Sequence, residues 1–122
     1  MTPTTPDKLR YTKIPLNTGS SSIPAVGFGT LIPDPLATEQ ATKTALEVGF
    51  RHFDCAERYR NEQAVGNAIQ TALKSGLRRE DLFITTKLWN TNHRPERVEP
   101  AFDASQKRLG INFVNLYLIH TP

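Results

Sequence analysis

The chain of 122 residues has the length of a single domain, and its 38% apolar and 22% charged residues are typical of a soluble globular protein. The 15 basic and 12 acidic residues give a net charge of +3, but the basic residues are scattered, which argues against a nucleic-acid-binding protein. No run approaches the roughly 18 consecutive apolar residues of a membrane span, so no membrane association is expected.

The N-terminal segment 1–10 is rich in proline and threonine and has no apolar core of a secretory signal. We expect it to be a disordered lead-in, with residues 11–122 forming one folded unit. The single cysteine, Cys55, allows no internal disulfide and no cysteine zinc site. A lone thiol suits a reducing compartment, so we expect a cytoplasmic protein.

Segments with strand character recur from residue 11 onward. They are rich in β-branched and aromatic residues, and turn residues separate the first two. The predicted strands are 11–16 and 22–24, which form a hairpin across the turn at 17–20, followed by 26–30, 50–54, 82–87 and 113–120.

Helical spacing of apolar residues fills the intervals between the later strands. A glycine follows each of these segments, as is common where a helix ends in a left-handed residue, and a proline suits the first turn of a helix. Three helices are therefore predicted, one around 41–48 before Gly49, one around 64–72 before Gly76, and one from Pro95 or Pro100 to Gly110.

Strands that alternate with helices predict an α/β fold with a parallel sheet. A polar residue closes three successive strands, since 33 residues separate Asp54 from Lys87 and again Lys87 from His120. In parallel α/β folds the carboxyl ends of the strands form the functional rim, and side chains alternate between the two faces of a strand. One polar strand end is usually a cap or loop residue, but three in phase favour a site.

Two chemistries are compatible with these residue types. In one, Lys87 is a Schiff-base nucleophile. In the other, Lys87 remains an ammonium and is held by Asp54. The ammonium stabilises the phenolate that forms when Tyr59 gives up its proton, so the Tyr59 phenol can serve as the proton donor. His120 can donate a hydrogen bond to a carbonyl substrate or share in the proton relay.

Other polar residues receive simpler interpretations. His52 shares a strand face with Asp54, but one histidine and one aspartate are too few for a zinc site, so no metal is expected. His93 is interpreted as a helix-entry residue, and Cys55 as a small residue packed beside Asp54. Glu62 is expected to order the loop that carries Tyr59.

Several motifs resemble the aldo-keto reductase family. Its first signature is resembled by residues 49–56 together with Tyr59, Asn61-Glu62 and Val65-Gly66. Its second active-site strand is resembled by residues 86–89, and its fourth-strand motif by residues 116–120. Residues 16–24 and 27–30 resemble its N-terminal hairpin and first strand. The resemblance implies a (β/α)₈ TIM-barrel type of fold, of which only the N-terminal half, a hairpin with about four strands and three helices, is expected here.

The resemblance also implies reduction of an aldehyde or ketone to an alcohol by hydride transfer from NADPH. By position in these motifs, the resemblance implies that Tyr59 donates the proton, that Lys87 makes this proton easier to release, and that Asp54 pairs with Lys87. It implies that His120 orients the carbonyl. Contacts with the cofactor are implied for Thr30 and Asp54, and contacts with the substrate for Leu31, Trp89 and His120. Leu31 and Thr121 stand where many members have tryptophan, so the resemblance names no particular carbonyl substrate.

Most of the family's cofactor-binding residues lie in the C-terminal half of its barrel, and a complete barrel needs about 250 residues. We therefore expect that this chain alone is not a competent reductase. It would then be a fragment, a truncated gene model or a split half that assembles, by self-association or with a complementing C-terminal half. The alternative is a non-catalytic half-barrel that associates through its open sheet edges.

Overall fold

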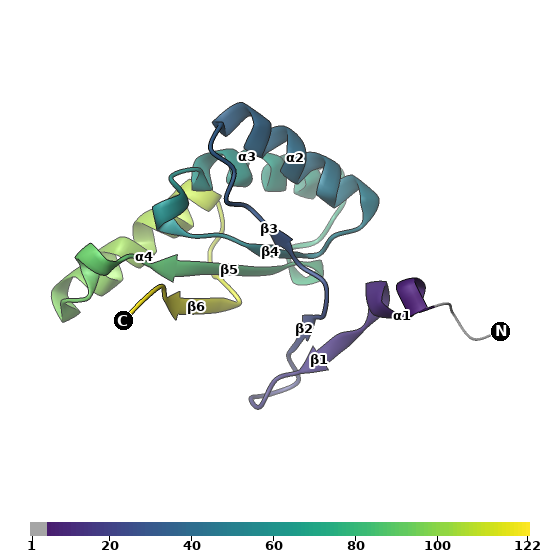
Figure 1. The fold of residues 1–122 in the computed structure, drawn as a ribbon, viewed down its shortest axis with the longest axis horizontal. Coiled ribbons are helices and arrows are strands. Elements are labelled where there is room, and N and C mark those ends of the chain that lie inside the picture. Colours follow the sequence, from purple (N-terminus) through teal and green to yellow (C-terminus); the bar gives the residue numbers. More distant parts are fainter. Residues whose placement is uncertain (1–4) are drawn as a thin grey trace.

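Helices and strands alternate along the chain in the computed structural model, which describes residues 5–122 (Figure 1). In chain order the elements are α1 (Thr5–Tyr11), β1 (Lys13–Pro15), β2 (Ser22–Pro24), β3 (Phe28–Gly29), α2 (Pro35–Val48), β4 (His52–Asp54), the 3₁₀ turn η1 (Glu57–Tyr59), α3 (Glu62–Lys74), η2 (Arg79–Asp81), β5 (Phe83–Leu88), η3 (Asn90–Asn92), α4 (Pro95–Leu109) and β6 (Leu116–Ile119).

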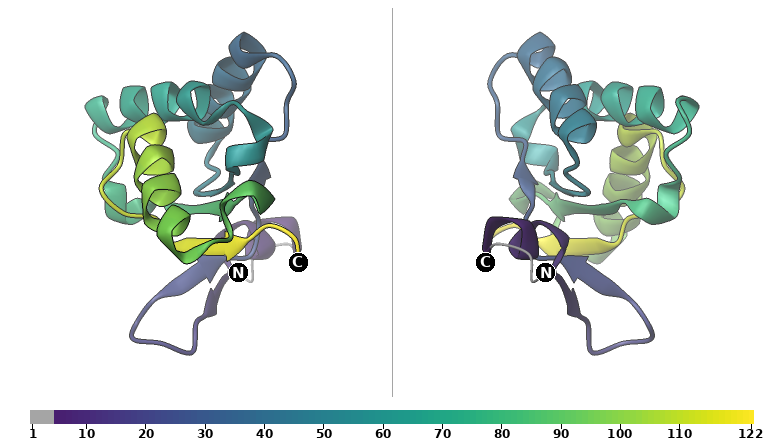
Figure 2. Two further views of the ribbon diagram at one scale, coloured as in Figure 1. Left: turned by 90° about the vertical axis from the view of Figure 1, so that its left-hand side faces the viewer. Right: turned by 90° about the vertical axis from the view of Figure 1, so that its right-hand side faces the viewer.

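The main sheet has the strand order β3-β4-β5-β6, and each neighbouring pair is parallel. Consecutive strands of this sheet are therefore neighbours, and one α-helix lies between each pair in the chain. The helices α2, α3 and α4 lie on the same face of the sheet (Figures 1 and 2). The predicted α/β organisation with a parallel sheet is confirmed.

The hydrophobic core lies between the sheet and these helices. Phe53 of β4 and Ile84 of β5 are completely buried there, in one cluster with Val65 of α3 and Leu109 of α4. Because side chains alternate along a strand, the neighbours of a core residue face the other way. Burial of Phe53 on the helix side thus turns Asp54 toward the opposite face.

Helix ends follow the expected chemistry. The carboxylate of Asp34 accepts a hydrogen bond from the Ala37 amide and begins α2, while Gly49, with φ of 109°, ends it. The two possible starts of the third predicted helix are resolved in favour of Pro95, and Pro100 lies inside α4. Pro100 is the sixth residue of α4, beyond the first four amides that have no intrahelical acceptor, so it removes the one backbone hydrogen bond that residue 100 would donate to the Glu96 carbonyl.

The predicted hairpin is present as β1 and β2, antiparallel with Ile14 opposite Ile23. It projects away from the main sheet (Figure 2). The ring of His52 lies 3.3 Å from the Pro24 carbonyl oxygen and meets Phe83 edge-on, at the end of the strands opposite the polar residues of interest. His52 therefore joins the hairpin to the sheet, in keeping with its structural interpretation.

Two expectations need correction. The lead-in 1–10 is not wholly without regular structure, because Thr5–Tyr11 forms α1; residues 1–4 lie outside the described part. Arg10 donates a hydrogen bond to the Val48 carbonyl at 2.6 Å, a long-range contact that local composition does not reveal. The last strand spans Leu116–Ile119 and not 113–120. Just before it, the Asn115 amide donates to the Ile84 carbonyl, and Asn115 Oδ1 accepts from the Ile84 amide, both at 2.8 Å.

No helix within residues 5–122 is long and apolar enough to cross a membrane.

Candidate active site

The three polar residues lie together at the carboxyl-terminal end of the parallel strands, on the face of the sheet opposite the helices. Asp54 is the last residue of β4, Lys87 lies near the end of β5, and His120 directly follows β6. The His120 amide donates to the Leu88 carbonyl at 3.1 Å, which continues the strand pairing to the site. The three residues predicted by their spacing are therefore brought together by the parallel sheet.

Lys87 is the centre of the cluster. Its Nζ lies 2.8 Å from Asp54 Oδ1, and it donates to the Cys55 carbonyl at 2.9 Å and to Tyr59 Oη at 3.2 Å. An ammonium group has three N–H donors, and these three acceptors match them. The Lys87 side chain is only 11% exposed, whereas that of Asp54 is 42% exposed. A partly buried ammonium thus holds the phenol oxygen, while the carboxylate remains open to a ligand.

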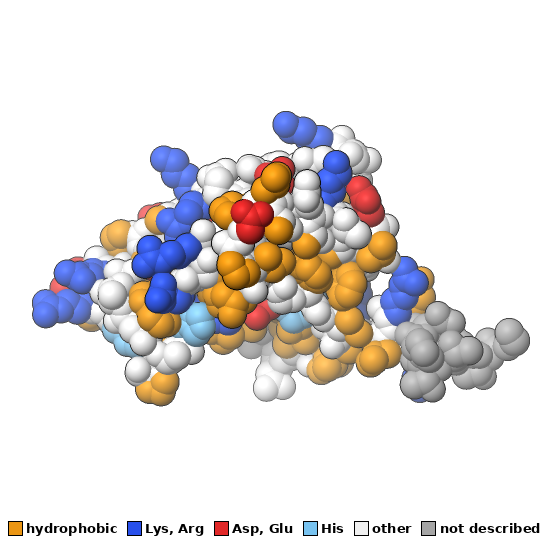
Figure 3. Space-filling model, turned by 45° about the horizontal axis from the view of Figure 1, so that its top comes forward, with side chains coloured by type: hydrophobic (Ala, Val, Ile, Leu, Met, Phe, Trp, Pro, Cys, Tyr) orange, Lys and Arg blue, Asp and Glu red, His pale blue; other side chains and the backbone are white. Residues whose placement is uncertain are grey.

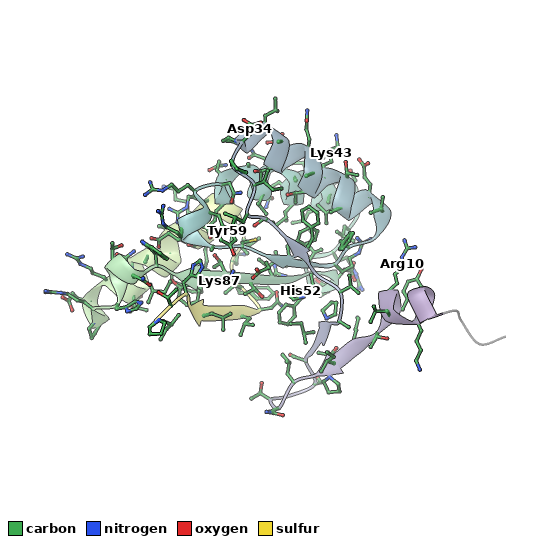
Figure 4. All side chains as sticks on the ribbon, viewed as in Figure 1. Arg10, Asp34, Lys43, His52, Tyr59 and Lys87 are labelled. Atoms are coloured by element: carbon green, nitrogen blue, oxygen red, sulfur yellow. The ribbon has the colours of Figure 1, made fainter. Side chains whose placement is uncertain are left out.

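A tight turn delivers Tyr59 to this position (Figure 4). It ends η1, and Arg60 follows with φ of 59°, the only positive φ outside glycine in the described chain. The turn is anchored by buried Asn61, whose Nδ2 donates to the carbonyls of Thr30 at 2.6 Å and Ile32 at 3.2 Å. Sequence reasoning included Asn61 only within the family motif and missed this anchoring role.

Glu62 begins α3 and lies behind the site. Its side chain is 1% exposed and accepts hydrogen bonds from Thr86 at 2.6 Å, from Ser105 at 3.0 Å and from Arg108 at 2.8 Å. The network joins α3, β5 and α4, and it reaches β5 at Thr86, the neighbour of Lys87. The expectation that Glu62 orders the loop carrying Tyr59 is not supported by these bonds, which run to β5 and α4 instead. The pairing with Arg108 could not be read from local sequence.

Aromatic rings line the other side of the cluster. The ring of His120 meets Tyr59 edge-on at a centroid distance of 5.8 Å and Trp89 at 5.4 Å. Its Nδ1 is buried and has no hydrogen-bond partner among the described residues. His120 is therefore placed between a phenol and an indole, with its ring orientation set by packing.

Comparison with known proteins points to one family. The sequence profile described as the aldo/keto reductase family matches residues 25–122. Aldo-keto reductase family 1 member C18 of Rattus norvegicus is 46% identical over 114 residues, which cover 90% of this chain. The chain belongs to the aldo/keto reductase family.

Other members have similar identity. D/L-glyceraldehyde reductase of Hypocrea jecorina is 48% identical over 111 residues, or 89% of this chain, and aldo-keto reductase family 1 member C1 of Homo sapiens is 46% identical over 117 residues, or 93%. The matched regions are 35%, 33% and 36% of the rat, fungal and human proteins. This aldo/keto reductase chain therefore spans about a third of the length of these relatives.

The residues expected to contact cofactor and substrate lie around the cluster in different environments. Thr30 is completely buried, and its hydroxyl donates to the Asp54 carbonyl at 2.8 Å. Leu31 is exposed, and Trp89 is half-buried against His120. Thr121 donates to Asn90 Oδ1 at 2.7 Å, which joins the chain after β6 to η3. Their contacts with ligands remain predictions.

The side chains of the remaining candidates take no part in the hydrogen bonds of the cluster. His93 is exposed after η3. Cys55 is completely buried, and this burial raises the pKa of its thiol to about 12, so the thiol remains protonated and unreactive. Within residues 5–122, no group of three or more metal-ligating side chains is assembled.

Proposed function

We propose that this aldo/keto reductase chain supplies the catalytic groups of an NADPH-dependent carbonyl reductase, which converts an aldehyde or ketone to an alcohol. The observation that carries the proposal is the position of Lys87 Nζ, 2.8 Å from Asp54 Oδ1 and 3.2 Å from Tyr59 Oη. A phenol that accepts a hydrogen bond from an ammonium can release its own proton at lower cost, because the ammonium stabilises the phenolate.

In the reaction, Tyr59 Oη donates its proton to the carbonyl oxygen of the substrate as that oxygen gains negative charge. Lys87 remains protonated and stabilises the phenolate, and Asp54 holds the ammonium in place. His120, beside Tyr59, orients the carbonyl through a ring N–H. NADPH, when bound, supplies the hydride that reaches the carbonyl carbon.

The described residues fit only the nicotinamide-ribose end of such a cofactor. The 42% exposed carboxylate of Asp54 can accept a hydrogen bond from a ribose hydroxyl, and buried Thr30 fixes the backbone beside it. No charged cluster within residues 5–122 is assigned to the pyrophosphate or the 2′-phosphate. The preference for NADPH over NADH is therefore proposed from the family.

We also propose that the isolated chain is not competent. It spans about a third of the relatives' length, and its strands β3 and β6 are the outer strands of the sheet. Unpaired outer strands favour association, here with a C-terminal half of the barrel. A cytoplasmic location is proposed from the free, buried thiol of Cys55.

The test uses the purified chain with NADPH or NADH and glyceraldehyde, and follows the absorbance of the reduced nicotinamide. No turnover is expected from the chain alone. Turnover is expected after assembly, verified by sedimentation, with the remaining segment of the Hypocrea jecorina D/L-glyceraldehyde reductase. Loss of that turnover in Tyr59→Phe supports the proton-donor role. Robust turnover by the isolated chain contradicts the need for a second half, and an assembled barrel without Tyr59-dependent turnover contradicts the reductase proposal.

A second candidate is a non-catalytic half-barrel that associates through its edges. The exposed Ile119 and Leu118 on β6, and an apolar groove of about 500 Å³ lined by Phe28, Ala41 and Val48 beside β3, favour it. An apolar band also crosses the face drawn in Figure 3. Tight self-association by sedimentation, together with no NADPH binding in a titration, would favour this candidate over the reductase.

The Schiff-base alternative is disfavoured by the contacts of Lys87. A nucleophilic amine needs a free lone pair, but this nitrogen is directed at three acceptors and is paired with a carboxylate. Treatment with borohydride and a carbonyl compound should therefore leave no adduct on Lys87, and mass spectrometry detects one if it forms.

A further inference from the structure

A cation lies one aromatic ring away from the catalytic cluster. Arg58 directly precedes Tyr59, and its Cζ lies 5.2 Å from the centroid of the Trp89 ring. The same indole meets the His120 ring at 5.4 Å. Stacking on an indole holds a guanidinium in place while leaving its N–H donors in the plane free for another partner. The position of Arg58 is therefore defined, but its hydrogen-bonding capacity is not used up.

Arg58 faces a groove between η1 and α4. The groove has a volume of about 720 Å³, and Arg60, Arg97 and Trp89 also line it. Figure 3 shows Lys and Arg side chains gathered at the left-hand end of the molecule. In Figure 1 the helix α4 lies at this end. A concave surface with several guanidinium groups attracts anions and raises their local concentration.

The acidic residues of the groove leave Arg58 unpaired. Glu57 accepts from Asn92 at 2.9 Å, and Glu62 is paired with Arg108. Glu96 is the third carboxylate of the lining, but the ion pairs of residues 5–122 include none with Arg58. An unpaired surface arginine is ordinary by itself. Arg58 differs in that it stacks on the indole of Trp89, which itself contacts the His120 ring, so one aromatic ring separates its guanidinium from the cluster.

We propose that Arg58 binds an anionic group, a carboxylate or a phosphate, on the carbonyl substrate. The preferred substrates are then small aldehydes or ketones with such a group several bonds from the carbonyl, lying along Trp89. This inference rests on the proposed reductase function and specifies its substrate class. A guanidinium offers two parallel N–H donors to a carboxylate or phosphate, which gives both affinity and orientation.

The test uses the fluorescence of Trp89, the only tryptophan of the chain, and needs no turnover. The complete chain is titrated with succinic semialdehyde and with its methyl ester, and separately with glyceraldehyde 3-phosphate and with glyceraldehyde. These probes do not absorb strongly where the indole is excited. We expect each anionic aldehyde to bind about tenfold more tightly than its uncharged counterpart, since one charge-assisted contact is involved. The pair with the larger ratio identifies the carboxylate or the phosphate as the preferred group.

Arg58→Gln should remove that difference by weakening only the anionic probes about tenfold. Arg58→Lys should retain part of it, because the charge remains but the planar fork is lost. Lys43→Gln, which removes an equal charge from the exposed side of α2, should change neither ratio. Higher ionic strength should weaken the anionic probes alone.

Equal affinity for charged and uncharged probes overturns the proposal, as does an Arg58→Gln variant that weakens both members of a pair equally. Absence of any binding also overturns it. Because the readout is Trp89 fluorescence, failure here is distinguishable from failure of the nicotinamide assay that tests the reductase function.

Discussion

The carboxylate of Glu62 meets the guanidinium of Arg108 at 2.8 Å, with Glu62 1% exposed and Arg108 38% exposed. The two ends of this ion pair therefore have unequal access to water. If the pair is broken, Arg108 can be rehydrated in place, whereas Glu62 cannot. Glu62 also accepts a hydrogen bond from Thr86, the neighbour of Lys87 on β5, so the integrity of the pair bears on β5 as well as on the packing of α3 against α4.

Arg108→Met should destabilise the chain more than Glu62→Gln. Removing Arg108 leaves a buried carboxylate with only Thr86 and Ser105 as donors, at a cost of about 3 kcal/mol. Glu62→Gln keeps an acceptor and leaves an arginine that water can reach, at a cost of about 1–2 kcal/mol. Urea unfolding of both variants measures the difference. Equal losses of unfolding free energy in the two variants, or a larger loss in Glu62→Gln, would show that the unequal exposure of the two side chains does not set the cost of breaking the ion pair.

Tyr59→Phe should lower kcat/KM of the assembled reductase by roughly 10²–10⁴, the range of a lost general acid. Lys87→Met should cause a comparable loss, because Lys87 acts through the phenol oxygen it contacts. Adding Lys87→Met to Tyr59→Phe should then reduce activity little further. Lys43→Met is the control for charge. Additive losses in the double variant would indicate that Lys87 has a role independent of Tyr59.

Gly66 tests the close approach of α3 to α4. A Cβ at this position would overlap the Arg108 carbonyl oxygen and lie 2.9 Å from Leu109 Cα, so one helix backbone must move. Gly66→Ala should therefore destabilise the chain by about 1–3 kcal/mol, although alanine by itself favours a helix. Gly29→Ala, where no other atom lies within 4 Å, should have a much smaller effect. A more stable Gly66→Ala variant in thermal unfolding would contradict the close approach.

Cys55 should make stability fall at high pH. Burial raises the pKa of its thiol from 9.0 to about 12, so between these values the unfolded chain loses this proton and the folded chain retains it. The free energy of unfolding should therefore decrease with rising pH, by up to about 1.4 kcal/mol per pH unit from this group. Urea unfolding from pH 8, below the window set by the pKa shift from 9.0 to about 12, up to about pH 11, inside it, should show a shallower decrease in Cys55→Ala. Identical slopes would refute the assignment to Cys55.

The same burial makes the thiol a reporter of unfolding. Iodoacetamide should label Cys55 only as fast as the chain opens, because thiolate formation requires exposure. The labelling rate should rise with urea in parallel with the unfolded fraction. Rapid labelling without urea would mean that the thiol is accessible in the native chain.

The sequence alone determined the alternation of elements and the placement of three catalytic candidates. Gly49 and Gly110 mark helix ends by their own backbone preference, which is a local property. The 33-residue spacing places Asp54, Lys87 and His120 at successive strand ends, and a parallel sheet then brings them to one edge. These inferences needed only periodicity and the geometry of the β-strand.

Only the tertiary structure decided which side chains meet across long sequence separations. Glu62 and Arg108 lie 46 residues apart, and Arg10 reaches Val48 across 38. Such contacts depend on how helices pack, and many charged residues could have filled either role. The stacking of Arg58 on Trp89, with Trp89 against His120, has the same origin. The strand ends alone left a Schiff-base chemistry and a proton-donor chemistry both open, and carbonyl reduction was implied by the family resemblance. The proposal of an anionic substrate required the packing of side chains around the strand ends.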